Sequence, residues 1–320
     1  GMAVDEMLNL KNVDLASGNI DFDGTVIVDK DVAEDMRVIA TGDICIGGLV
    51  ESSHLQAGGS VFIGKGIIGR QIQESKDSKD SKKEPEPVQY AMVILAGGDI
   101  RSTYAQSAEL NSGGSVYIQK YLYHSRVEAA DSLWVGSDKI ANGKLIGGEI
   151  SVGAAVQAGT IGMPSAVPIN IDLSSRIRDS KERQDGLRRE LDLAAESESK
   201  LANLLTSLWK RGLHLTAEKL QRLKDTHAED QRRVAVLQTD MRQLEAEQAQ
   251  LIAEIKVVAR KTLHPGVILR LLDKVERVGR DHNAVEVRVT ENLGLEIRPI
   301  RSAQRRQGKI SKTIKHEDQE

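Results

Sequence analysis

Cysteine, aromatic residues and long apolar runs are scarce in this sequence, and each scarcity excludes a class of protein. Cys45 is the single cysteine among 320 residues, so an internal disulfide framework and a cysteine-ligated zinc or iron–sulfur site are excluded. The aromatic content of 3% is low for a compact enzyme core. No apolar run approaches the ~20 residues that span a bilayer, and the start GMAVDEMLNL does not resemble a signal peptide. We therefore expect a cytoplasmic protein.

Charge and glycine divide the chain into regions. Residues 1–172 contain 14 Lys/Arg against 23 Asp/Glu, whereas residues 173–262 contain 18 against 15. Of the 28 glycines, 22 precede residue 173. The N-terminal half and the segment that follows it must therefore have different structures.

A short unit of glycine and alternating aliphatic residues recurs in the N-terminal half. Its starts are spaced by 18, 17, 39, 16, 17 and 17 residues. A period of about 17 residues is typical of one coil of a three-sided β-solenoid, in which stacked coils bury the apolar face that one coil cannot bury alone. The units are GTVIV at 24, GDICI at 42, GSVFI at 59, GDIRS at 98, GSVYI at 114, DSLWV at 131 and GEISV at 148.

Period-2 alternation within the unit predicts an inner and an outer column of side chains. The inner column is predicted to contain Val26, Ile44, Val61, Ile100, Val116, Leu133 and Ile150. The outer column is predicted to contain Ile27, Cys45, Phe62, Arg101, Tyr117, Trp134 and Ser151. We place this parallel β-helix at residues 14–172, and we expect the charged insert at about 71–88 to be disordered.

Heptads replace glycine in residues 173–262. Mostly aliphatic residues, with a few polar exceptions, recur at 3-4 spacing from Ile177 to Leu208 and again from Leu220 to Val258, on either side of Gly212. This pattern predicts an antiparallel coiled-coil arm in which the residue numbers of two facing residues add up to about 428. Leu191 would then face Leu237, and Glu198 would face Asp230, where the two carboxylates should repel.

The C-terminal part alternates apolar and charged residues in a way typical of strands. We expect residues 263–300 to form strands that pack back on the solenoid, and residues 301–320 to form a disordered basic tail. We do not expect this tail to bind nucleic acid or membrane, because it lacks aromatic residues and also contains Glu317, Asp318 and Glu320.

The motifs GNIDFDGTVIV and ATGDICIGGLVESSHLQAGGSVFIGKGIIGR, within residues 18–70, and HPGV at 264–267 resemble the flagellar assembly protein A family of bacteria. The resemblance covers about residues 14–300 and extends distantly to the solenoids of bactofilins and MinC. It implies a right-handed parallel β-helix, a cytoplasmic location with the cell pole as a candidate, and a non-enzymatic adaptor in flagellar assembly or motility. No catalytic residue is carried over from the family pattern.

Two functions remain open from the residues alone. One is a scaffold that binds protein partners, and the alternative is a β-helix enzyme that acts on carbohydrate or acyl groups. The sequence predicts no catalytic residue, cofactor, metal site or small-molecule substrate, because no convergent polar cluster is evident. Homo-oligomerisation is a further candidate. The candidate protein-binding residues are Phe62, Tyr117, Trp134, Trp209, Leu213 and Leu215.

The outer column has two possible covers. The returning strands 267–300 could pack over it, which we favour from the sequence, or part of it could stay exposed as a binding strip with Tyr117 and Trp134 as anchors.

Overall fold

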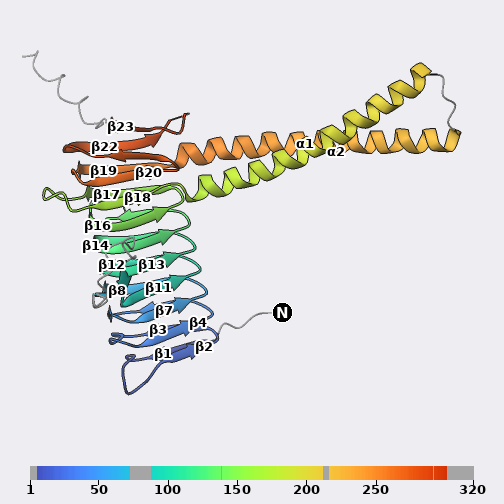
Figure 1. Ribbon diagram of the computed structural model, residues 1–320. Helices are drawn as coiled ribbons and strands as arrows, with labels where there is room; N and C mark the ends of the chain where they lie inside the picture. Colours follow the sequence, from blue (N-terminus) through green and yellow to red (C-terminus); the bar gives the residue numbers. More distant parts are fainter. Residues whose placement is uncertain (1–5, 73–87, 138, 212–215, 291, 301–320) are drawn as a thin grey trace, which may run out of the picture.

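The computed structural model describes residues 6–72, 88–137, 139–211, 216–290 and 292–300. The predicted disorder of the insert and of the tail falls on residues 73–87 and 301–320, outside the described residues. The described part has two regions, a tall stack of strands and a long pair of helices that projects from one end of the stack (Figure 1).

The strands stack as parallel neighbours on three faces, and several long strands bend from one face to the next. Face 1 comprises β1 (Met7–Leu10), β3 (Thr25–Val28), β5 (Ile44–Ile46), β15 (Leu133–Val135) and the first parts of β8 (Val61–Ile68), β12 (Ile100–Gln106), β14 (Val116–Ala129), β17 (Ala155–Ile161) and β19 (Lys256–Leu263).

Faces 2 and 3 continue each coil. Face 2 comprises β6 (Leu49–Glu51), the first part of β16 (Lys144–Val152), the middle of β14 and the ends of β8, β12, β17 and β19. Face 3 comprises β2 (Ile20–Phe22), β4 (Arg37–Ala40), β7 (His54–Ala57), β11 (Met92–Ala96), β13 (Ala108–Ser112), the ends of β14 and β16, β18 (Ile169–Asp172) and β20 (Val267–Leu271).

The core lies inside the three faces. All seven residues of the predicted inner column are buried, each at most 2% exposed. Six of them form one column on face 1, but Ile150 does not belong to it. Ile150 pairs with Val127 and Ile171 on face 3, and Val156 takes its place beside Leu133.

Glycines at the corner between faces 3 and 1 let successive coils approach closely. A Cβ on Gly97 would lie 2.2 Å from the Gly58 carbonyl oxygen, and a Cβ on Gly113 would lie 2.2 Å from that of Gly97. Any side chain at these positions would force neighbouring coils apart, which explains the paired glycines that mark the repeat.

The arm consists of α1 (Ser175–Arg211) and α2 (Ala217–Glu254). At ~1.5 Å per residue it reaches roughly 55 Å. Every described position of the predicted heptad series within the helices is buried or half-buried. The predicted end of the arm at residue 262 is wrong, because α2 ends at Glu254 and Val258 lies in β19, where pairing with β17 replaces helix packing.

The predicted register of the arm agrees with its polar contacts. The Ser197 hydroxyl donates to Asp230 Oδ2 at 2.8 Å, and Gln231 Nε2 donates to Glu198 Oε1 at 3.5 Å. His227 Nδ1 also lies 3.8 Å from Glu198 Oε1. The predicted repulsion between Glu198 and Asp230 is therefore offset, because each carboxylate has a polar partner on the other helix.

The chain after the arm completes the stack and then closes it. β19 and β20 add a last parallel coil, which places residues 255–271 in the solenoid. β21 (Lys274–Arg277) pairs antiparallel with β20, β22 (His282–Val289) with β19, and β23 (Leu295–Pro299) with β22.

At the other end the solenoid begins at β1, before the predicted residue 14. A small antiparallel pair, β9 (Gln71–Ile72) and β10 (Gln89–Tyr90), flanks the insert.

Candidate binding surfaces

The outward column of face 1 contains most of the residues predicted for it. Strand register aligns Ile27, Cys45, Phe62, Arg101, Tyr117 and Trp134 one above another. Ser151 is not part of this column, because it pairs with Glu128 on face 3. Gln157 follows Trp134 instead, and Val258 follows Gln157. We call Phe62, Arg101, Tyr117 and Trp134 the face 1 strip.

The members of the face 1 strip differ in exposure. Phe62 is 38% exposed and is the most open of its aromatic residues. Tyr117 is half-buried, because the Arg101 guanidinium carbon lies 4.4 Å from its ring centroid. The Trp134 indole Nε1 donates to the Ser137 carbonyl oxygen at 2.9 Å, which fixes the ring against the loop after β15. Tyr117 and Trp134 are thus preordered, and Phe62 is the open end of the strip.

The expectation that the returning strands cover this column is wrong. β22 lies beside β19 as a further strand of the same face, and β21 lies beside β20 on face 3. Hydrogen bonding to the last coil places these strands at the end of the stack, so among the described residues they leave the face 1 strip uncovered.

Of the remaining predicted binding residues, only Trp209 is among the described residues. Trp209 is in the last turn of α1, and Leu213 and Leu215 lie outside the described residues. Of the predicted binding residues, the structure therefore brings Phe62, Tyr117 and Trp134 together on face 1.

Sequence reasoning missed a cluster of tyrosines on face 2. Tyr104 and Tyr121 are neighbours in register, with ring centroids 5.1 Å apart, and Tyr123 lies 4.6 Å from Tyr121. The Tyr104 ring lies over Gly66, where a Cβ would collide with it. Desolvation, and then the neighbouring Tyr104 and Tyr123, raises the pKa of Tyr121, so its hydroxyl stays neutral. The 17-residue spacing of Tyr104 and Tyr121 was the signal that could have revealed it.

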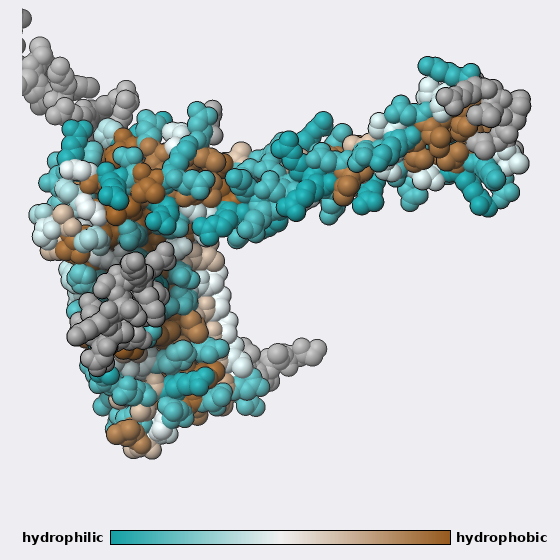
Figure 2. Space-filling model, in the orientation of Figure 1, coloured by the Kyte–Doolittle hydropathy of each residue, from teal (hydrophilic) through white to brown (hydrophobic). Residues whose placement is uncertain are grey.

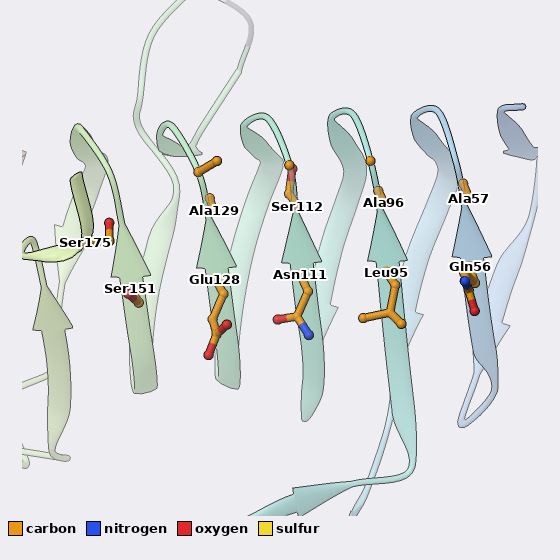
Figure 3. A pocket seen from close by; sticks show the side chains of 13 residues that line it. Gln56, Ala57, Leu95, Ala96, Asn111, Ser112, Glu128, Ala129, Ser151 and Ser175 are labelled. Carbon is orange, nitrogen blue, oxygen red and sulfur yellow. The ribbon is translucent and has the colours of Figure 1, made fainter. Parts of the chain in front are cut away.

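A shallow groove of about 510 Å³ follows face 3 below the start of α1 (Figure 3). It is lined by the outward column Gln56, Leu95, Asn111, Glu128 and Ser151 and by small residues of the corner between faces 3 and 1. The Asn111 side-chain oxygen has no hydrogen-bond partner among the described residues. The groove therefore offers polar contacts.

Charged residues converge on face 3 next to this groove, a second feature that sequence reasoning missed. Arg126 NH2 lies 2.9 Å from a Glu149 carboxylate oxygen, and Arg126 NH1 lies 3.9 Å from Glu109. Desolvation opposes the charge on Arg126, but the bond to Glu149 outweighs it and raises the arginine pKa. Strand pairing, rather than sequence proximity, assembles this cluster from β13, β14 and β16.

Cys45, the free cysteine of face 1, is not activated for chemistry. Burial, and then the Asp43 carboxylate, raises the pKa of the Cys45 thiol, which makes it a poor nucleophile at neutral pH. The G-x-G-x-x-G sequence at residues 64–69 forms no strand-to-helix turn, because Gly64 and Gly66 lie within β8 and Gly69 directly follows it. Among the described residues no three His, Cys, Asp or Glu side chains are grouped to hold a metal ion.

Stacked parallel coils with an inserted helical hairpin define a β-solenoid protein. The chain belongs to the flagellar assembly protein A (FapA) beta solenoid domain family, whose model matches residues 6–293. This match confirms the predicted family and links the chain to flagellar assembly. The searches of curated proteins and of solved structures returned no match.

Proposed function

We propose that this protein is a non-enzymatic cytoplasmic scaffold of flagellar assembly, which binds other proteins through the face 1 strip and through its helical arm. The cell pole is the candidate location. The family supports the flagellar role. We infer in addition that the solenoid is right-handed, as the family resemblance implies. We also infer that the arm is a coiled coil, as its heptads predict.

One observation carries the scaffold proposal. Phe62 lies exposed on a rigid parallel face, between Cys45 and the paired Arg101 and Tyr117, with no described strand over it. Preordered aromatic side chains bury much area at a small entropic cost and are frequent anchors of protein interfaces. The arm extends the reach of this surface by roughly 55 Å.

The test compares two double variants in a motile bacterium whose own copy of the gene is deleted. Phe62→Ala with Tyr117→Ala removes two aromatic side chains of the face 1 strip, and Leu15→Ala with Ile140→Ala removes exposed side chains elsewhere on the solenoid. We expect the first pair to reduce flagellar number in electron micrographs and swimming in soft agar, and the second to leave both normal. Normal flagellation with the first pair would refute this proposal.

The enzyme alternative has one supporting observation, the charged cluster of Arg126, Glu149 and Glu109 beside the face 3 groove. Carboxylate and arginine clusters on one solenoid face suit lyase chemistry on acidic sugars. The mutual pairing of these charges favours a structural role, so the scaffold remains our proposal.

A further inference from the structure

The corners of the solenoid carry opposite charges, although residues 1–172 are acidic overall. Aspartates occupy the corner between faces 3 and 1, at Asp23, Asp43, Asp99 and Asp131. The corner between faces 1 and 2 carries exposed basic residues in most coils. We call these residues the basic edge; they are Lys11, Lys30, Lys65, Lys120, Lys139, Arg260 and Lys261.

Backbone hydrogen bonds keep the edge straight. Lys30 N donates to Lys11 O at 3.0 Å, Gly48 N to Lys30 O at 2.8 Å, and Lys65 N to Gly48 O at 3.1 Å. Coils of a parallel stack repeat at ~4.8 Å, so the corners that carry these cations follow one another along the solenoid axis.

The cations of the basic edge are available for a partner. None of them forms an ion pair with another described residue, whereas Arg101, Arg126 and Arg176 elsewhere on the solenoid and arm base all do. Among the described residues, Asp29 and Asp31 interrupt the edge, and the Leu49 backbone N–H donates to Asp31 Oδ1 at 2.7 Å.

The tyrosine cluster lies directly behind the edge. Tyr121 follows Lys120, and Tyr104 follows Thr103, which occupies the same corner one coil below. Tyrosine is enriched where proteins meet the headgroup level of a bilayer. The arm leaves from another corner, because α1 follows β18 on face 3 and α2 leads into β19 on face 1. It therefore does not obstruct the edge; Figure 1 shows it extending sideways from the stack.

We propose that the basic edge docks on an anionic lipid bilayer, with the tyrosine cluster at headgroup level and the arm directed away from the membrane. A straight, convex line of lysines fits a flat surface. Proteins that hold single-stranded nucleic acid instead use a groove and aromatic faces open to bases, and here the rings cover one another. No described helix is both long and apolar enough to cross a bilayer, so this contact is peripheral.

The test is vesicle flotation of the full chain with two matched triple variants. Lys65→Glu, Lys120→Glu and Lys261→Glu reverse the edge, and Arg189→Glu, Lys210→Glu and Arg232→Glu reverse the same charge on exposed positions of the arm. All variants keep the same residues after 300, so the basic tail cannot produce a difference. Circular dichroism melting checks that each variant folds.

We expect the wild type and the arm variant to float with vesicles containing phosphatidylglycerol, less so at high salt, and not with pure phosphatidylcholine. Each lysine near an anionic surface contributes about fivefold in affinity, so losing three lysines weakens binding about a hundredfold. The edge variant should bind at least that much more weakly, because each glutamate is also repelled by the anionic surface. Equal flotation of wild type and a folded edge variant, or no flotation of the wild type, overturns the proposal.

A parallel binding assay with a single-stranded oligonucleotide tests the alternative ligand. Edge-dependent binding of the oligonucleotide without flotation would assign the edge to nucleic acid and refute the membrane. The face 1 strip is intact in every variant, so this proposal can fail while the scaffold proposal stands.

Discussion

The solenoid and the arm use similar aliphatic residues but bury them to different depths. Leu122 in the solenoid is 0% exposed, because coils above and below and the two other faces enclose it. Leu191 in the arm is only half-buried, since two helices cover one side of each other. Figure 2 shows the consequence, with hydrophilic residues dominating the middle of the arm.

The difference shows what each architecture is suited to. A stacked sheet satisfies its backbone only through residues distant in sequence, so it is rigid and opens cooperatively. A two-helix arm has local hydrogen bonds and an open seam, so it tolerates polar layers such as Ser197 with Asp230. The solenoid is therefore suited to present a rigid binding surface, and the arm is suited to reach a distant partner.

The strongest test of this contrast is one substitution made in both regions. Leu122→Ala should destabilise the solenoid by about 2–5 kcal/mol through lost burial and a cavity. Leu191→Ala should destabilise the arm by about 1–2 kcal/mol, because its side chain remains partly hydrated in the native state. Native-state hydrogen exchange, which separates the two regions, measures both. Equal effects would contradict the contrast in burial.

The second test sharpens the contrast at the polar layer of the arm. Replacing Glu198 and Asp230 together by leucine should stabilise the arm by about 1–2 kcal/mol, since apolar packing often exceeds a partly buried polar network. Native-state hydrogen exchange should show this gain in the arm and no change in the solenoid. Glu229→Leu, at an exposed position, serves as the control. A loss of arm stability in the double variant would show that the polar partners dominate this layer.

The inner column of face 1 was predictable because each coil repeats one strand pattern at a nearly constant period. The prediction failed at Ile150 and Ser151, where the segment GEISV has the right pattern and spacing but lies on face 3. The cause is the longer corner between Val135 and Lys144, which moves the next face 1 strand to Ala155–Ile161. Period alone cannot distinguish the three faces of a coil.

The arm was predictable from heptads, but its end was not, because Val258 continues the 3-4 spacing inside a strand. Pairing with β17 decides that segment, and this contact lies about a hundred residues away in sequence. The tyrosine cluster, the Arg126 cluster and the basic edge were missed for a similar reason. Each consists of residues from different coils, and only the register between strands shows that these residues lie on the same face or corner.

The smallest expected effect concerns pH and is confined to the solenoid. His54 lies on face 3 in register with Arg37 of the preceding coil. Burial, and then the Arg37 charge, lowers the pKa of His54 in the folded protein. Because the unfolded chain binds the proton more readily, this residue's contribution to stability is present above the unfolded pKa and is lost as pH falls through it.

The solvent contact of His54 limits this loss to a few tenths of a kcal/mol. Urea unfolding at pH 7.5 and pH 5 should therefore show a slightly smaller acid-induced loss for His54→Gln than for the wild type. Arg37→Gln should lie between them, because it removes the charge repulsion and leaves the burial. A larger acid-induced loss in His54→Gln would mean that the protonated imidazole stabilises face 3, which would contradict the repulsion between His54 and Arg37.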